Sequence, residues 1–251
     1  MVTMLPPDGA AALAAKRVRA CLLSGGASRR MGHDKALLPH PEGGSWLERT
    51  LRLLLELQIP VTLFSRHQRH LQIARALNGE PITALAEAPP WEGPLLALHR
   101  LMQHHPDERL LLCPVDMPDL SLAALRSLLA KADDAAAVGG PVQLHLAHDG
   151  QRLQPLLGVY PSTAPLRADL SAAVERGERR LQGWLATQAF EVVILDPRAL
   201  RNVNHPEAAQ PAGSPADAPS SIALRSQRRS SASSNVSSSI GDAGSGKGPC
   251  S

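Results

Sequence analysis

Leu22–Leu38 reads LLSGGASRRMGHDKALL, and it overlaps the end of a short apolar run, Val18–Leu23, that is typical of a buried strand. Gly25 and Gly26 allow main-chain N–H groups to approach an anion closely, because no Cβ intervenes and a positive φ costs little. Lys35 adds a positive charge for the same anion. The stretch therefore predicts a polyphosphate-binding loop at the end of a strand.

Two common phosphate loops do not match this stretch. The P-loop needs Gly-Lys-Ser/Thr, whereas Lys35 follows Asp34 and precedes Ala36. The dinucleotide fingerprint needs Gly-x-Gly-x-x-Gly, and the glycines here have a different spacing. The sequence excludes both of these motifs.

The stretch resembles, residue for residue, the signature L-x-G-G-x-S-x-R-M-G-x-D-K of nucleotidyltransferases with a Rossmann-like fold, and among them the molybdenum cofactor guanylyltransferases (MobA-like nucleotidyltransferases). A glycine-rich surface turn with solvated arginines is the alternative. The matching residues are Leu23, Gly25, Gly26, Ser28, Arg30, Met31, Gly32, Asp34 and Lys35.

The rest of the chain predicts an α/β fold. Apolar runs interpreted as buried strands are Val18–Leu23, Pro60–Phe64, Arg109–Cys113 and Ala135–Gly139. Stretches with leucines at helical spacing are Trp46–Leu57, His70–Leu77, Pro94–His104 and Leu122–Lys131. Such alternation is typical of a Rossmann-like, mostly parallel sheet with helices on both faces, and the resemblance implies the nucleotide-diphospho-sugar transferase type. Ligands of such sheets bind at the carboxyl ends of the strands.

The chain is expected to have three parts. Residues 1–17 are interpreted as a disordered lead-in and residues 18–209 as a nucleotidyltransferase domain. Residues 210–251 are rich in Ser, Ala, Pro and Gly and have few large apolar side chains, so they are expected to form a disordered tail.

A second motif, Cys113–Pro118, follows a predicted strand. A carboxylate in that position is well placed to hold a divalent ion, since Mg²⁺ typically uses one or two carboxylates together with substrate phosphates. Asp116 supplies the carboxylate, and the resemblance makes it the Mg²⁺ ligand, because the guanylyltransferases carry the same C-x-x-D-x-P motif. The alternative is a helix cap, a role that Asp119 or Ser121 could also take.

Other matches run in family order from Val18 to Glu207. Glu92–Leu95 resembles the family's Gly-Pro-Leu motif, which opens a helix. The remaining matching segments are Ser65–His67, Gln154–Tyr160, Gly177–Arg180 and Asn202–Glu207.

The sequence also departs from the family pattern. Ser24 replaces the usual alanine, and Leu63 and His205 stand where a polar residue and a threonine are expected. The nearest candidate for the family's guanine-reading aspartate is Glu87, offset by one residue. These departures leave nucleotidyl transfer in place and leave the base preference open.

Composition limits the class of protein. The chain has 251 residues, 43% of them apolar, which is enough for one substantial core. No apolar run approaches the roughly 20 residues that cross a bilayer. The first residues lack the leading positive charge of a secretory signal, and the three cysteines are widely separated. A cytoplasmic protein is expected.

The net charge of +3 does not predict nucleic-acid binding, because two of the three charges lie after Ala208 and aromatic residues make up 2% of the chain. The clustered histidines, among them His70, His105 and His145, are expected to be solvated. No Ser-His-Asp arrangement is expected.

The resemblance implies transfer of GMP from GTP to the terminal phosphate of molybdopterin carrying molybdenum, with release of pyrophosphate. Its partners would be GTP, molybdopterin, and molybdopterin-donor and acceptor molybdoenzymes, without nucleic acid or a membrane. The alternatives are a molybdopterin cytidylyltransferase, a sugar-phosphate nucleotidyltransferase, and a non-catalytic nucleotide-binding protein that delivers cofactor.

The resemblance also assigns residues. Arg30, Lys35 and Asp116 would be catalytic, and Asp116 would bind Mg²⁺. The nucleotide would be held by Leu23, Ser24, Gly25, Gly26, Lys35, Glu87, Gly93 and Asp116. The pterin side would be formed by Arg179, Arg180, Asn202 and Asn204.

Overall fold

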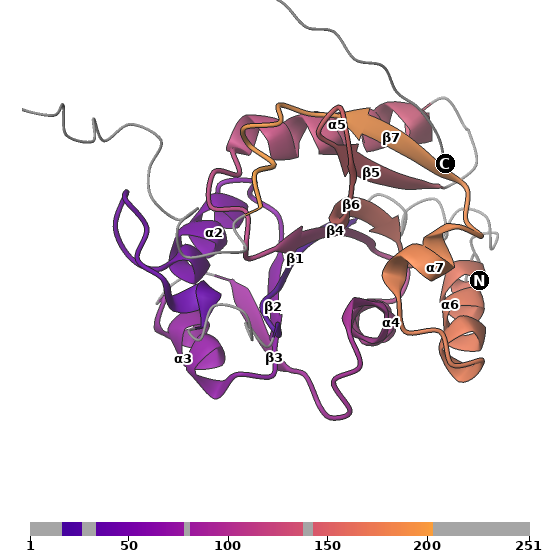
Figure 1. The fold of residues 1–251 in the computed structure, drawn as a ribbon, viewed down its shortest axis with the longest axis horizontal. Helices are drawn as coiled ribbons and strands as arrows, with labels where there is room; N and C mark the ends of the chain where they lie inside the picture. The colour runs from indigo at the N-terminus through magenta and orange to yellow at the C-terminus, as the bar shows by residue number, and fades with distance from the viewer. Residues whose placement is uncertain (1–16, 27–33, 78–80, 138–142, 203–251) are drawn as a thin grey trace, which may run out of the picture. The chain divides into compact units, whose positions relative to one another are not determined.

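The computed structural model describes residues 17–26, 34–77, 81–137 and 143–202. In these residues seven strands form one sheet in the order β3-β2-β1-β4-β6-β5-β7 (Figure 1). β6 runs antiparallel to its neighbours β4 and β5, and the other pairs are parallel. The strands are β1 (Val18–Leu23), β2 (Val61–Ser65), β3 (Ile82–Ala86), β4 (Arg109–Pro114), β5 (Leu144–His148), β6 (Leu153–Pro161) and β7 (Phe190–Ile194).

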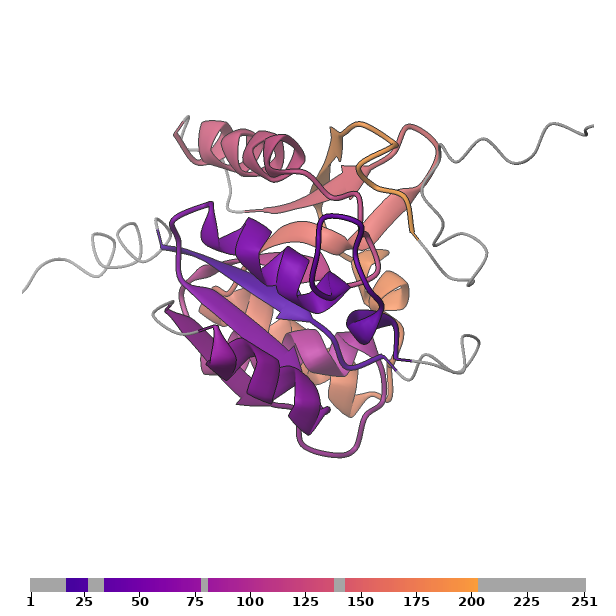
Figure 2. The same ribbon diagram turned by 90° about the vertical axis from the view of Figure 1, so that its left-hand side faces the viewer.

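Helices cover both faces of the sheet. α2, α3 and α5 pack on the face that includes Ala20 and Leu22, and Figure 2 looks onto α2 and α3. α4, α6 and α7 pack on the opposite face, which includes Cys21 and Leu112. The helices are α2 (Trp46–Leu55), α3 (Gln68–Ala76), α4 (Pro94–His104), α5 (Leu122–Ala137), α6 (Ala164–Glu175) and α7 (Leu181–Leu185), with a short 3-10 helix, η1 (Lys35–Leu37). The predicted fold class is therefore confirmed.

β1 lies in the middle of this arrangement. Its successive residues Ala20, Cys21 and Leu22 alternate between the two hydrophobic cores, and all three are fully buried. A strand buried on both faces needs a continuous apolar run rather than an alternating one. This requirement explains why Val18–Leu23 was recognisable in the sequence.

Local signals place the helix starts. At α2, Ser45 and Glu48 form a capping box, in which the Ser45 backbone N–H donates to Glu48 Oε2 at 2.7 Å and the Glu48 N–H donates to Ser45 Oγ at 3.3 Å. At α4, Pro94 occupies the first turn, where the missing N–H costs no hydrogen bond, and Gly93 precedes it with φ +106°. Pro94 thus fixes where α4 begins.

The structure corrects one predicted strand. Residues 135–137 of the run Ala135–Gly139 continue α5, and residues 138 and 139 lie outside the described residues. The alanine-rich sequence there favours a helix, so α5 extends past its predicted end at Lys131. The lead-in, apart from Arg17, and the tail also lie outside the described residues.

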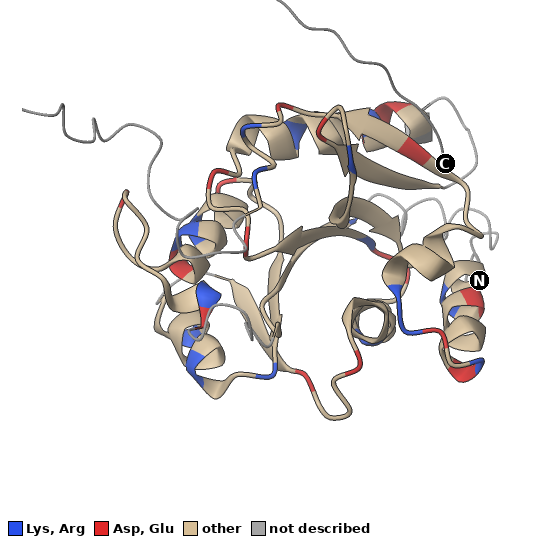
Figure 3. Ribbon diagram, viewed as in Figure 1, with Lys and Arg blue, Asp and Glu red and all other residues tan. Residues whose placement is uncertain are grey.

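The charge distribution and the helix lengths concern two classes of partner, nucleic acids and membranes. Acidic and basic residues are interspersed along the described part of the chain (Figure 3). None of the described helices combines the length and apolar character that a bilayer-spanning helix needs.

The expectation that the histidines are solvated is wrong for three of them. His70, His105 and His145 are buried. His105 follows α4, and its Nε2 lies 3.1 Å from Thr62 Oγ1 in the first half of β2. Burial lowers the pKa of His105 from 6.5 to about 4.

This pKa predicts an acid-sensitive fold. Between pH 6.5 and about 4 the unfolded chain binds a proton at His105 and the folded chain does not, so the free energy of unfolding falls as the pH falls. We expect the wild-type Tm to drop more between pH 7 and pH 5 than the Tm of His105→Gln, whose amide can still bond Thr62 but does not titrate. Equal drops in both proteins, measured by thermal melting, would contradict this.

Candidate active site

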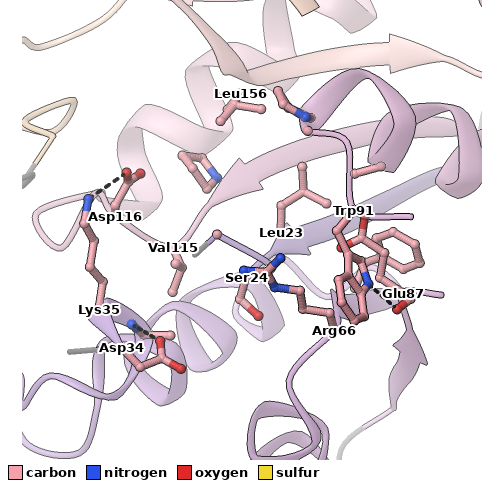
Figure 4. A pocket seen from close by; sticks show the side chains of 18 residues that line it. Leu23, Ser24, Asp34, Lys35, Arg66, Glu87, Trp91, Val115, Asp116 and Leu156 are labelled. Carbon is pink, nitrogen blue, oxygen red and sulfur yellow. Dashed lines mark hydrogen bonds and ion pairs between the residues drawn. The ribbon is translucent and has the colours of Figure 1, made fainter. Parts of the chain in front are cut away.

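The loops that follow β1 to β4 surround a cavity of about 360 Å³ (Figure 4). In the sheet register, Leu23 pairs with Phe64 of β2 and with Pro114 of β4, and all three residues line the cavity. The cavity therefore lies at the carboxyl ends of the parallel strands, where ligands of α/β sheets bind.

All eight residues predicted to hold the nucleotide line this cavity. They come from β1 and the connection that follows it, from the connection after β3 and from the connection after β4, so the fold brings together residues that lie up to 93 positions apart in the sequence. These residues are Leu23, Ser24, Gly25, Gly26, Lys35, Glu87, Gly93 and Asp116. Arg30, the other predicted catalytic residue, lies outside the described residues.

The start of the glycine loop is packed closely against the loop after β3. A Cβ at position 25 would lie 2.7 Å from Glu87 Oε2, a distance too short for two non-bonded atoms. The backbone N–H of Ser24 donates to the Phe64 carbonyl at 3.2 Å and extends the sheet by one bond. Glycine at position 25 therefore allows the Glu87 carboxylate to reach the loop backbone.

Lys35 and Asp116 meet on one side of the cavity (Figure 4), with 3.7 Å between Lys35 Nζ and Asp116 Oδ2. Lys35 is the first residue of η1, and Asp116 follows β4. Burial raises the pKa of the Asp116 carboxyl, and the Lys35 ammonium opposes that shift. A cation and a partly desolvated carboxylate thus meet at one point, which suits phosphate groups accompanied by a metal ion.

The helix-cap alternative for Asp116 does not hold. Ser121 takes that role at α5, because its Oγ accepts from the Ala124 backbone N–H at 3.2 Å. Asp119 pairs with Arg201 at 2.6 Å. Among the described residues no three His, Cys, Asp or Glu side chains gather in a metal-binding cluster. A single carboxylate fits Mg²⁺ bound mainly through substrate phosphates and water better than it fits a closed, all-protein metal site.

Glu87 is a buried residue of the cavity lining, and its carboxylate lies near the Arg100 guanidinium. Arg100 Nη1 lies 3.6 Å from Glu87 Oε1. Burial raises the pKa of Glu87, while Arg100 and then Arg66 lower it. The surrounding arginines thus favour an ionised acceptor in a largely desolvated position.

Sequence reasoning missed two further cavity residues, Arg66 and Trp91. The Trp91 ring is half exposed, and its Nε1 donates to the Glu87 carbonyl at 3.0 Å. The Arg66 guanidinium lies 5.3 Å from the centre of that ring. Arg66 follows β2 within the segment matched to the family's Asn-Arg-His, so a signal was present, whereas an isolated tryptophan gives none.

None of the described residues predicted for the pterin side lines the cavity, although Arg179 lies beside it. The Arg179 carbonyl lies 3.4 Å from where a Cβ of Gly93 would stand, and Arg179 also pairs with Glu92. Arg180 and Asn202 do not line the cavity. Asn202 donates to Gln154 Oε1 at 3.0 Å, and Asn204 lies outside the described residues.

A Ser-His-Asp arrangement is present, contrary to expectation. His70 Nε2 lies 2.8 Å from Asp34 Oδ2, and His70 Nδ1 lies 3.0 Å from Ser24 Oγ. His70 is 1% exposed, and both of its partners line the cavity. Its position on the buried side of α3 with Leu71 and Ala74 was the signal available in the sequence.

Solved structures with a similar fold include the molybdopterin-guanine dinucleotide biosynthesis protein A from Archaeoglobus fulgidus, at 16% identity and a TM-score of 0.58, covering 76% of this chain and 94% of that chain. A nucleotidyl transferase from Methanothermobacter thermautotroptrophicus, at 19% identity and a TM-score of 0.59, covers 76% and 93%. At these identities the likeness supports the fold alone.

Sequence comparison goes further. A probable molybdenum cofactor guanylyltransferase from Rhodopirellula baltica is 37% identical over 194 residues, which are 74% of this chain and 86% of the relative. A molybdenum cofactor guanylyltransferase from a Shewanella species is 32% identical over 199 residues, covering 77% and 94%. Residues 20–192 match the family model described as the MobA-like NTP transferase domain. The chain therefore belongs to the MobA-like NTP transferase family.

Proposed function

We infer that the protein is a molybdenum cofactor guanylyltransferase. It transfers GMP from GTP to the terminal phosphate of molybdenum-bound molybdopterin and releases pyrophosphate. An oxygen of the pterin phosphate forms a bond to the α-phosphorus, and the bond from the α-phosphorus to the β-phosphate oxygen breaks. The observation that carries this is Lys35 within 3.7 Å of Asp116 in a cavity at the strand ends, in a chain 37% identical to a probable guanylyltransferase.

The protein's task in such a transfer is alignment and charge stabilisation rather than covalent chemistry. The main chain at Gly25 and Gly26 receives the nucleotide, with Leu23 and Ser24 before it. Lys35, together with Arg30, offsets negative charge on the β- and γ-phosphates. Asp116 would hold a divalent ion, Mg²⁺ in our proposal, which withdraws charge from the phosphate oxygens when bound.

Base selection is assigned to Glu87. An ionised carboxylate accepts hydrogen bonds only, and the edge of guanine offers two adjacent N–H donors, whereas cytosine offers its amino group. Arg100 at 3.6 Å favours the charged form of Glu87 against the effect of burial, and Gly25 gives it room. Gly93 forms the border of the cavity on the side of Arg179.

Arg179, Arg180, Asn202 and Asn204 remain assigned to the pterin side. Arg179 adjoins the cavity at Gly93, which supports its part of that assignment. We further propose a cytoplasmic enzyme that receives molybdopterin from a donor protein and serves acceptor molybdoenzymes, without nucleic acid or a membrane as a partner.

The test supplies purified protein with Mg²⁺, molybdopterin-loaded acceptor and GTP, CTP, ATP or UTP in turn. We expect pyrophosphate release and guanine dinucleotide cofactor with GTP, and at least tenfold less product with CTP. Equal or better use of CTP would make the protein a cytidylyltransferase. Transfer to a sugar phosphate instead would make it a sugar-phosphate nucleotidyltransferase. GTP binding without pyrophosphate release would favour a non-catalytic delivery protein.

A further inference from the structure

His70 connects two parts of the chain that line the nucleotide cavity. Its ring lies on α3, outside the glycine loop, yet Nε2 contacts Asp34 at 2.8 Å and Nδ1 contacts Ser24 Oγ at 3.0 Å. Nδ1 also lies 3.0 Å from Ser65 Oγ and from the Ser24 carbonyl. Ser24 follows β1 and Asp34 precedes η1, so one imidazole holds the residues on both sides of the loop.

The two ring nitrogens meet different partners. A carboxylate can only accept, so His70 Nε2 donates to Asp34 Oδ2. Around Nδ1 lie the hydroxyls of Ser24 and Ser65 and the Ser24 carbonyl, and the Ser65 hydroxyl also donates to that carbonyl at 3.2 Å. Burial lowers the pKa of His70, and Asp34 opposes that shift. Ser24 is the chain's departure from the usual alanine, so its hydroxyl beside His70 is a feature of this chain.

Asp34 carries the connection onward to Lys35. Its Oδ2 contacts His70, and its Oδ1 accepts from the Ala36 backbone N–H at 3.1 Å. Asp34 is therefore both the partner of His70 and the N-cap of η1, the helix that begins with Lys35. Two side chains, His70 and Asp34, therefore connect α3 with Lys35, whose ammonium faces Asp116.

We propose that His70 is a positioning residue, which holds Lys35 at the phosphate site through Asp34. This role rests on the proposed function, because Lys35 is its target. The order Asp34, His70, Ser24 is that of the serine hydrolases, but here the ring also contacts Ser65 and a backbone carbonyl. The network connects Ser24, which follows β1, with Asp34, which precedes η1.

Two amide variants separate this role from general stability. Glutamine places its NH₂ near the position of Nε2 and can still donate to Asp34, whereas asparagine places it near Nδ1 and cannot. We expect His70→Asn to lower kcat/KM for GTP about tenfold to hundredfold, in line with the loss of one hydrogen bond to a charged group, and His70→Gln to lower it less than about threefold. Equal losses in both would overturn the proposal.

A double-mutant cycle with Lys35→Ala identifies the path. If His70 acts through Lys35, His70→Asn costs little once the lysine is gone, so the two effects are not additive. His105→Asn is the matched control, because His105 is also buried and hydrogen-bonded. Its partner is Thr62 in the first half of β2, and His105 does not line the cavity. Its effect is expected to be the same in both backgrounds. Additive losses for His70 would overturn the proposal.

Nucleotide binding, measured by calorimetry, separates this inference from the proposed function. The cycle is repeated with whichever of GTP, CTP, ATP and UTP the wild type binds most tightly. Preference for another base overturns the guanine assignment. The double-mutant cycle with that nucleotide still measures the coupling between His70 and Lys35. If no nucleotide binds, both the proposed function and the role of His70 are overturned.

Ser24→Ala is the last variant. If its turnover falls to the uncatalysed rate, the Ser24 hydroxyl takes part in the chemistry and the positioning role of His70 is overturned.

Discussion

Asp116→Ala is expected to lower pyrophosphate release about a thousandfold, because the carboxylate that faces Lys35 would be lost and, with it, the proposed ligand of the divalent ion. The melting temperature should hold or rise slightly, since burial already raises the pKa of this carboxyl and its removal relieves a desolvated charge. The measurement is turnover over a range of Mg²⁺ concentrations, with melting as a check on folding.

The matched control is Asp119→Ala. Asp119 lies three positions along the same loop and pairs with Arg201, but it does not line the cavity. Its variant should keep turnover within about twofold, because the side chain lies outside the cavity and an ion pair of this exposure contributes little to stability. If Asp116→Ala turns over normally at ordinary Mg²⁺ levels, the carboxylate does not hold the metal.

Lys35→Ala should lower kcat/KM for GTP about a hundredfold, because a phosphate-facing cation stabilises charge that grows in the transition state. Arginine in its place should restore only part of the activity, since a planar guanidinium does not occupy the position of a compact ammonium. Steady-state kinetics with varied GTP measure kcat and KM separately.

Lys131→Ala serves as the control, because Lys131 is exposed on α5 and lies outside the cavity lining. Normal kinetics in Lys35→Ala, with a normal melting curve, would leave Lys35 with no part in the reaction.

The sequence predicted the centre of the fold better than its edges. β1, β2 and β4 were recognisable because strands buried on both faces need unbroken apolar runs, and α4 because Gly93 and Pro94 mark its start. β3 and β7 are the edge strands and are partly exposed, β5 alternates histidines with apolar residues, and β6 carries proline and glycine within it, so no apolar run stands out. Ala135–Gly139 failed because an alanine-rich run suits a helix as well as a strand.

For the site, motif positions fell at the cavity because each directly follows a strand or opens a helix there. His70 and Trp91 were missed for a different reason. The roles of these two side chains depend on contacts that form only in the folded chain, with Asp34 for His70 and with Arg66 for Trp91. No spacing in the sequence predicts such contacts.

The 2.7 Å between Glu87 Oε2 and the space beside Gly25 couples the glycine loop to the side chain to which we assign base selection. The contacting atom is the end of a flexible side chain, so a larger residue at position 25 would be accommodated when the Glu87 carboxylate turns away from the loop. A substitution at position 25, natural or engineered, is therefore expected to change nucleotide preference through position 87 without disturbing the fold.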